Sequence, residues 1–329
     1  MDTGDQSDLC FPQLANTSCR KPSSDLSDGV LFSVLLSAEC VLTVLLNLLV
    51  IISISHFRHL HTPTNLLLLS LAVSDLLVGF VAMPGEIYVR ISCWFLGDIA
   101  CSLWNYMIFT TGSSSVGNMV LISADRYMAI CDPLRYNVKV TVKRIQLCVC
   151  LSWVASLLYC AIILKDQLGR PGMYNSCHGK CVIGFEVYAG ILDLIVSFVV
   201  PVSIIITLYL RVFVVAVSHA RAMRSHVKCV KLQHSAPLRA KSSELKAART
   251  IGVLVLVFLV CFCPYYSVSL VDENEKLGSL LKYVVYLYAF NSCVNPLIYA
   301  LFYPWFRKAV KDIVTLHILK PASRDANIL

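Results

Sequence analysis

The sequence predicts an all-α integral membrane protein: a bundle of seven transmembrane helices followed by a short amphipathic helix. Its composition is the first reason, because 57% of the 329 residues are hydrophobic and only 15% are charged, whereas soluble domains carry about 25% charged residues. The second reason is a set of seven apolar stretches, each near the ~20 residues that a helix needs to cross a bilayer. The stretches cover residues 30–55, 65–88, 101–130, 142–164, 187–217, 247–271 and 280–302.

Each stretch is expected to be a helix because a segment in lipid must satisfy its backbone hydrogen bonds internally. The alternating segments of a membrane β-barrel are absent from the sequence. There is also no internal repeat that would suggest a second domain. We therefore divide the chain into an N-terminal segment (1–29), a seven-helix transmembrane domain (30–303) and an amphipathic helix with a C-terminal tail (304–329).

The distribution of basic residues predicts the orientation. Of 28 Lys and Arg residues, eight fall in the N-terminus, in the connections after the second, fourth and sixth stretches or at the adjoining end of the seventh stretch, and 20 fall on the other side. Positive charge is retained on the cytoplasmic side, so the N-terminus is expected outside the cell. Nucleic-acid binding is the other meaning of a basic run, and the flanking apolar helices argue against it. The longest connections are 165–186 outside and 218–246 inside.

The two ends of the chain carry their own signals. The N-terminal segment is polar and lacks the apolar core of a cleavable signal peptide. Asn16 begins an Asn-Thr-Ser acceptor for N-glycosylation in this segment. After the seventh stretch, Trp305, Phe306 and later apolar residues alternate with basic ones. That pattern predicts a helix lying on the inner leaflet in contact with membrane lipid.

Six of the 15 cysteines lie on the predicted outer side, where they can oxidise. They are Cys10, Cys19, Cys93, Cys101, Cys177 and Cys181. Six cysteines allow many pairings, so spacing alone leaves the connectivity open. The other nine cysteines lie within the spans or on the inner side, where we expect packing thiols.

Polar residues inside the predicted spans are candidates for function because they are costly in a membrane. Asp75 lies in the middle of the second span and Ser115 lies in the third, while the seventh contributes Asn291, Ser292 and Asn295. An oxygen-rich cluster of this kind suits a small hard cation, so an allosteric sodium ion is one interpretation. The alternative is a hydrogen-bonded network without an ion. No other cofactor is expected.

A second polar group lies at the inner face. Asp125, Arg126 and Tyr127 close the third span, and Glu244 precedes the sixth on the same side. Arg126 could pair with both acids and hold two helix ends together as a bistable element. Solvated surface charges are the alternative. Pro201, Pro264 and Pro296 each remove a helical hydrogen bond and permit kinks in the fifth, sixth and seventh spans.

Aromatic residues surround the proline of the sixth span. Phe258 and Phe262 precede Pro264, and Tyr265 and Tyr266 follow it. Buried tyrosine hydroxyls need partners, so we expect at least one of the two tyrosines to line a ligand pocket. Simple packing is the alternative, and we assign Phe258 to it.

These residues occur with others in a specific order and spacing. The set is Asn47, Asp75, Asp125-Arg126-Tyr127, Trp153, Pro201, Pro264 and Asn295-Pro296-Leu297-Ile298-Tyr299. In that arrangement the chain resembles rhodopsin-class G-protein-coupled receptors over about residues 31–311. The run from Asn291 to Lys308 looks like the seventh-helix fingerprint of trace amine-associated receptors. The run from Asp125 to Tyr136 and the outer cysteines at 10, 19, 177 and 181 also fit that family.

The resemblance implies a plasma-membrane receptor, not an enzyme, that senses a small cationic amine, usually in olfactory neurons. It implies a stimulatory heterotrimeric G protein that raises cyclic AMP, with arrestin and a receptor kinase as further partners. By the family pattern, Cys101 bonds Cys181, and Cys177 bonds Cys19 or Cys10. Arg126 is expected to be released on activation to receive a G-protein helix. Tyr209, Tyr299 and the Asn295-Pro296 pair are expected to belong to the same switch.

The chain departs from the family in its amine signature. The usual aspartate of the third helix is Ile108 here, and the usual Trp before the helix-six proline is Phe262. Asp193, eight residues before Pro201, is the candidate replacement, since some family members carry an aspartate there. Ser197 lies one turn below it. The alternative for Asp193 is a structural pair with a neighbouring helix.

The same residues bear on other ligands and other classes of protein. Glu86, at the outer end of the second span, is a second candidate acid that we expect to be solvated. Because Ile108 breaks the amine signature, a peptide or lipid receptor is the alternative function. A retinal protein would need a lysine in the seventh span, and residues 283–302 contain none. A transporter would show repeats and discontinuous helices, and the sequence shows neither. It also lacks a recognisable pair of nucleophile and base that would indicate an enzyme.

Overall fold

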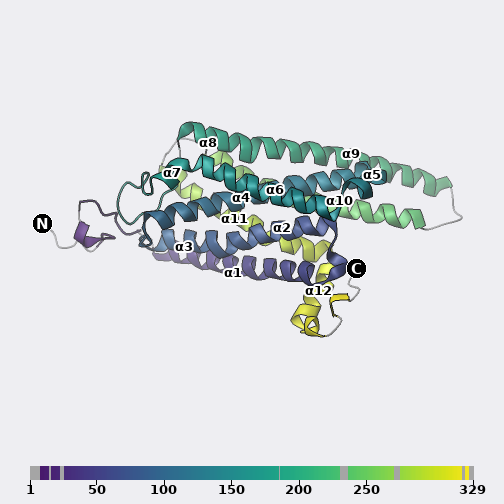
Figure 1. Cartoon of the computed structure of the whole chain (residues 1–329), viewed down its shortest axis with the longest axis horizontal. Coiled ribbons are helices and arrows are strands. Elements are labelled where there is room, and N and C mark those ends of the chain that lie inside the picture. Colours follow the sequence, from purple (N-terminus) through teal and green to yellow (C-terminus); the bar gives the residue numbers. More distant parts are fainter. Residues whose placement is uncertain are drawn as a thin grey trace.

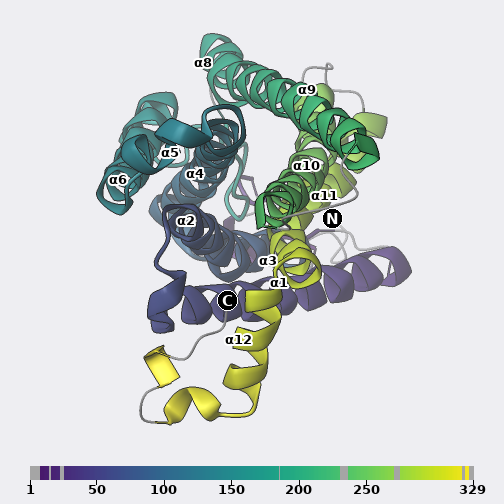
Figure 2. The ribbon, with the colours of Figure 1, turned by 90° about the vertical axis from the view of Figure 1, so that its right-hand side faces the viewer.

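The protein is an elongated bundle of helices, seen from the side in Figure 1 and along its length in Figure 2. The computed structural model describes residues 8–14, 16–22, 26–184, 186–229, 236–269, 275–320 and 323–325. Within these residues, side chains at 26–30, 216, 219–229, 236–251, 269 and 275–282 are outside the description. The bundle confirms the predicted fold class, and all seven predicted spans are helical over their described residues except Leu164, which forms a turn.

The spans follow one another in chain order. The first is α1 (Leu26–His56), and the second combines α2 (Pro63–Leu77), the π-helical turn η3 (Val78–Ala82) and α3 (Met83–Ile91). The third and fourth are α4 (Gly97–Cys131) and α6 (Val142–Ile163). The fifth combines α8 (Val187–Asp193), the π-helical turn η4 (Leu194–Val199) and α9 (Val200–Cys229). The sixth and seventh are α10 (Ala236–Ser269) and α11 (Glu275–Phe302).

Local sequence explains where two of these helices begin. The Thr62 hydroxyl accepts a hydrogen bond from the Asn65 amide at 3.3 Å, and Pro63 occupies the first position of α2. The Thr141 hydroxyl accepts from the Arg144 amide at 3.4 Å, at the start of α6. Such side chains satisfy amide groups that have no partner within the first turn.

The helices differ in the length of their apolar segments. In the described part of the chain, five are long and apolar enough to cross a membrane: Leu31–His56, Pro63–Ile91, Val142–Ile163, Val187–Val215 and Tyr283–Phe302. The sixth span has a shorter apolar run, Gly252–Val268. The third span, α4, contacts α2, α6, α9 and α10 and buries many polar residues, including Ser102, Asn105, Thr111, Ser115 and Asn118. Its neighbours therefore shield its polar side chains from lipid.

The amphipathic helix is present as α12 (Pro304–Val314), which lies across the inner end of the bundle beside α1 (Figure 1). Trp305, Phe306 and Ala309 are buried and join the main apolar core. The remaining faces of α12 are exposed or half-buried and carry Arg307, Lys308 and Lys311. Packing against α1 and α11 therefore fixes the helix, in addition to any contact with lipid.

The inner connection between the fifth and sixth spans differs from the expected loop at 218–246. Helix α9 continues to Cys229 and α10 begins at Ala236, so both helices extend well beyond the apolar stretches. The expected loop was placed where hydropathy falls. The polar extensions of the two helices are rich in Ala, Arg, Met and Lys, and these residues favour a helix in water as well. The connections at 131–142 and 164–187 also contain short helices, α5 (Pro133–Lys139) and α7 (Lys165–Gly169).

Candidate functional site

A cavity of about 150 Å³ lies in the half of the bundle nearest the N-terminal segment, which we call the outer half. Side chains from all seven spans line it, including Phe32, Glu86, Ile108, Tyr159, Asp193, Tyr265 and Tyr288. A cavity of about this volume accommodates a benzene-sized molecule. The structure therefore offers a site for a small ligand. We call it the outer cavity.

The structure brings most of the predicted ligand residues to this cavity. Ile108, Asp193, Ser197, Tyr265 and Tyr266 all line it. Phe262 is not part of the lining and lies in the core, 2% exposed. Its ring packs on Tyr288 at 4.3 Å and on Phe258 at 4.2 Å between centroids. Phe262 therefore connects the aromatic wall of the cavity with the core.

Asp193 is the acid in the cavity wall contributed by the fifth span. Its side chain is largely buried, because the residue is 8% exposed. The Tyr159 hydroxyl donates a hydrogen bond to Asp193 Oδ1 at 2.8 Å, and the Ser197 hydroxyl donates to the same atom at 2.9 Å. The described residues place no basic side chain within ion-pair distance of it. Asp193 therefore pairs with helix α6 and also lines the cavity, and its role as the counter-ion of a ligand stays a prediction.

Tyr159 was missed by the sequence reasoning. It lies in α6 among apolar residues, and its hydroxyl is also 3.2 Å from that of Ser197. Nothing in the local sequence distinguishes it from a packing tyrosine. The π-helical turn η4 begins directly after Asp193, and such turns are frequent at functional sites.

Replacing Tyr159 tests whether it positions Asp193. We expect Tyr159→Phe to lower the potency of a ligand held by Asp193 by about 10-fold to 150-fold, because a hydrogen bond to a charged group contributes about 1.5–3 kcal/mol. The measurement is a concentration–response curve at matched surface expression. Tyr106→Phe is the control, since that hydroxyl bonds the Leu157 carbonyl at 3.0 Å instead. Equal curves for both variants would show that Tyr159 does not position the carboxylate.

Glu86 also lines the outer cavity, contrary to the expectation of a solvated acid. It forms an ion pair with Arg90, one helical turn further along α3. The two side chains are only 25% and 21% exposed, respectively. The Arg90 guanidinium lies 5.3 Å from the ring centroid of Phe32 in α1. The charge of Glu86 is therefore already balanced, unlike that of Asp193.

Four of the five residues proposed for sodium meet in the middle of the bundle. Ser292 and Asn295 each donate to the Asp75 carboxylate at 2.8 Å, and Ser115 lies within 3.4 Å of it. Asp75 is fully buried. Asn291 is buried close by in α11, but no hydrogen bond links it to Asp75, and its side-chain oxygen has no partner among the described residues. The side-chain oxygen of Asn295 also has no partner among the described residues, and oxygen atoms are the ligands that a hard cation prefers, so the sodium ion stays a prediction.

The predicted ion pair between Asp125 and Arg126 is present at the inner face. Arg126 Nε donates to Asp125 Oδ2 at 3.0 Å, and Asp125 is 4% exposed. Two hydroxyl groups that the sequence did not suggest also donate hydrogen bonds to the Asp125 carboxylate. They belong to Thr64, at 2.9 Å, and Tyr136, at 2.7 Å. Glu244 lies in α10, but its side chain is outside the described part, so the predicted contact with Arg126 stays a prediction.

The remaining switch residues lie near this face. Tyr209 of α9 packs closely on α10, because a Cβ added at Gly252 would lie 1.7 Å from its hydroxyl. Tyr299 is 1% exposed, and its hydroxyl has no hydrogen-bond partner among the described residues. Tyr127 packs against Ile130 and Val212, between the third and fifth spans. The residues expected to move thus lie on α4, α9 and α11.

Three disulfides crosslink the outer end. Cys101 at the start of α4 bonds Cys181, and Cys177 bonds Cys19, one of the two partners left open by the sequence. Cys10 bonds Cys93 in the connection between α3 and α4, a pairing that the sequence analysis left open. Asn16, the predicted glycosylation acceptor, is exposed between the two N-terminal cysteines.

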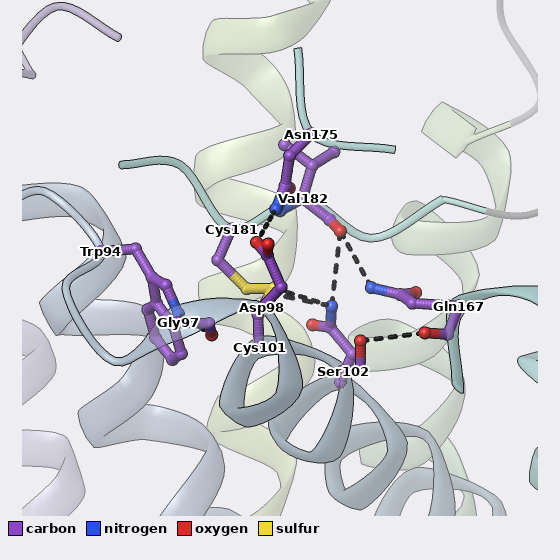
Figure 3. Close-up of a disulfide and its surroundings, with 10 residues drawn as sticks. Trp94, Gly97, Asp98, Cys101, Ser102, Gln167, Asn175, Cys181 and Val182 are labelled. Atoms are coloured by element: carbon purple, nitrogen blue, oxygen red, sulfur yellow. Dashed lines mark hydrogen bonds between the residues drawn. A yellow bond between two sulfur atoms is a disulfide. The ribbon is translucent and has the colours of Figure 1, made fainter. Parts of the chain in front are cut away.

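Hydrogen bonds around the Cys101–Cys181 bond hold the outer connection over the bundle (Figure 3). Gln167 Nε2 donates to the Val182 carbonyl at 3.0 Å, and Ser102 donates to the Gln167 carbonyl at 3.0 Å. Asn175 donates to Asp98 at 2.9 Å and accepts from the Val182 amide at 3.1 Å. This connection carries Ile183 into the wall of the outer cavity, so the disulfide positions part of the ligand site.

The sequence places the chain among known proteins. Residues 46–299 match the sequence model of the family described as 7 transmembrane receptor (rhodopsin family). Trace amine-associated receptor 13c of Danio rerio is 35% identical, with 98% of this chain and 97% of the relative covered. Trace amine-associated receptor 1 of Mus musculus is 36% identical over 94% of this chain and 97% of its own. Trace amine-associated receptor 8c of Rattus norvegicus is 37% identical, with 97% of this chain and 96% of the relative covered. The chain therefore belongs to the trace amine-associated receptors, within the rhodopsin family of seven-transmembrane receptors.

Proposed function

We propose that this receptor senses a small cationic amine whose ammonium group binds Asp193 in the outer cavity. The observation that carries the proposal is a largely buried carboxylate in the cavity wall with no basic partner among the described residues. An ammonium ion that leaves water needs such a fixed anion. The relatives are named as trace amine-associated receptors, which supports the same ligand class.

Aromatic rings complete the cation site. Tyr265 and Tyr266 line the cavity with their ring centroids 5.2 Å apart, and Tyr266 stacks on Phe198 at 4.6 Å. A ring face attracts a cation by about 0.5–2 kcal/mol. Ile108 provides an apolar surface where the usual aspartate of the family would stand. The cavity volume of about 150 Å³ favours a small amine over the alternative peptide or lipid ligand.

Signalling is proposed to run through the inner face. Release of Arg126 from Asp125 would free the guanidinium for a helix of a heterotrimeric G protein, the stimulatory type that raises cyclic AMP. Arrestin and a receptor kinase are proposed as further partners of this face. The three disulfides at the N-terminal end support an extracellular N-terminus at the plasma membrane. An olfactory role is proposed from the family alone.

The direct test is a panel of amines applied to cells that express the full-length receptor and a cyclic AMP reporter. We expect at least one primary or tertiary amine that is cationic at neutral pH to raise cyclic AMP, and its uncharged isostere to be silent. Equal activity of the isostere would reject the ammonium site. Activity of lipids or peptides alone would favour the alternative ligand class.

We also propose that the Asp75 cluster binds sodium. An ion that binds only the folded protein stabilises it by mass action, so sodium chloride should raise the unfolding temperature relative to a large organic cation at equal ionic strength. Asp75→Asn should abolish this difference, and Asp166→Asn, in the outer connection, should keep it. Sodium-dependent stabilisation that survives in Asp75→Asn would place the ion elsewhere.

A further inference from the structure

A second charged group lines the outer cavity on a different side of the bundle from Asp193. Glu86 and Arg90 extend into its wall from α3, beside Phe32 of α1 and Tyr286 of α11. Asp193 and Ser197 line the same cavity from the fifth span. A ligand in the cavity therefore encounters an acid with no basic partner at one site and an arginine–glutamate pair at another.

Arg90 has hydrogen-bonding capacity that Glu86 does not use. Nη2 of Arg90 forms the ion pair with Glu86 Oε1. Nε of Arg90 is buried and has no hydrogen-bond partner among the described residues. A guanidinium carries several N–H donors in a fixed planar arrangement that matches a carboxylate or a carbonyl oxygen. Because an unpaired buried donor is unfavourable, an oxygen acceptor supplied by the ligand would be stabilised there.

A second ammonium group fits this part of the cavity less well. It would have to draw Glu86 away from Arg90, and the guanidinium, 21% exposed, would then lose its counter-ion. Removing one partner of a largely buried ion pair is strongly unfavourable. The group favoured beside Arg90 is therefore an acceptor of hydrogen bonds and not a further cation.

We infer that the receptor selects amines that carry an oxygen acceptor, a carboxylate or a neutral carbonyl, at the end opposite the ammonium group. Asp193 holds the ammonium, and Arg90 donates hydrogen bonds to the acceptor while remaining paired with Glu86. This inference rests on the proposed function, because Asp193 must bind the amine. A site built to hydrogen-bond a ligand group discriminates strongly against analogues that lack the group.

Three matched series of probes test the inference on the full-length purified receptor. They are straight-chain alkylamines, the ω-amino acids of the same chain lengths, and the methyl esters of those amino acids. The readout is the ligand-induced rise in unfolding temperature, which needs no G protein. At one chain length, the ω-amino acid or its ester should bind about ten-fold or more tightly than the alkylamine. An advantage of the acid alone identifies an anionic acceptor, and an equal advantage of the ester identifies a neutral one.

Variants separate Arg90 from Asp193. Arg90→Gln should remove the advantage of the oxygen-bearing probes, and so should the double variant Glu86→Gln/Arg90→Gln, which leaves no unpaired acid in α3. Both should still bind the alkylamine. Arg170→Gln, an exposed outer arginine that does not line the cavity, should behave as the unmodified receptor. Asp193→Asn should no longer bind the probes of any of the three series.

The outcomes distinguish this inference from the proposed function. If alkylamines bind as well as the oxygen-bearing probes, or if the advantage persists in both Arg90 variants, the acceptor site is wrong while the amine site at Asp193 stands. If Asp193→Asn still binds the alkylamine normally, the proposed function itself fails. If no probe in any series shifts the unfolding temperature, both are overturned.

Discussion

Asp193→Asn is expected to abolish amine responses while surface expression persists. The substitution keeps the shape of the side chain and an oxygen for the Tyr159 and Ser197 hydroxyls, which lie 2.8 and 2.9 Å away. It removes only the charge. Loss of one partner of a buried charge pair costs about 2–5 kcal/mol, which corresponds to a roughly 30-fold to several-thousand-fold loss of affinity. The measurement is the cyclic AMP response to the best amine agonist, with surface receptor quantified on the same cells.

The matched control is Asp166→Asn, which makes the same chemical change in the outer connection, away from the cavity lining. Its concentration–response curve should overlie that of the unmodified receptor. A normal potency of the amine at Asp193→Asn would mean that the counter-ion lies elsewhere. Glu86 would then be the next residue to replace, because it also lines the cavity.

Arg126→Ala should eliminate G-protein activation and leave ligand binding within about three-fold of normal. Arg126 lies near the inner end of α4, whereas Asp193 lines the outer cavity, so the two residues are separated along the bundle. The fold should tolerate the change because Thr64 and Tyr136 still donate to Asp125, at 2.9 and 2.7 Å. Cyclic AMP in cells and ligand-induced stabilisation of the purified receptor measure the two properties separately.

Arg135→Ala serves as the control for this prediction. Arg135 is an exposed arginine in α5 on the same face, and none of the hydrogen bonds to Asp125 involves it. We expect its signalling to be close to normal. Retained cyclic AMP responses in Arg126→Ala would show that the receptor reaches its G protein without this guanidinium.

The spans were predictable because length and hydropathy report directly on the membrane. The apolar stretch at 142–164 matches α6 closely, since Thr141 also provides a helix cap that can be read from the sequence. The inner ends of α9 and α10 were not predictable in the same way. Hydropathy marks where lipid ends, but a helix of good helix formers continues past that boundary, as α9 does to Cys229.

The site was predictable where a residue is unusual for its surroundings. Asp75 and Asp193 stand out because a carboxylate is costly in a membrane span. Their partners do not stand out: Tyr159 and Thr64 are ordinary side chains that reach their acids only through the packing of different helices. The pairing of Cys10 with Cys93 is similar, because it depends on how the N-terminal segment lies over the bundle.

The disulfides of the outer end also bear on how the receptor is made. Cys10–Cys93 and Cys19–Cys177 close segments with sequence separations of 83 and 158 residues. In the chain-entropy account, each such bond stabilises the folded state by about 4–5 kcal/mol relative to the reduced chain. The described cysteines outside the outer end are free. The crosslinks of the outer half thus need an oxidising folding compartment, whereas the inner half can form without one. A receptor that leaves that compartment reduced would keep its inner face but lack the crosslinks that hold the outer connection over the cavity.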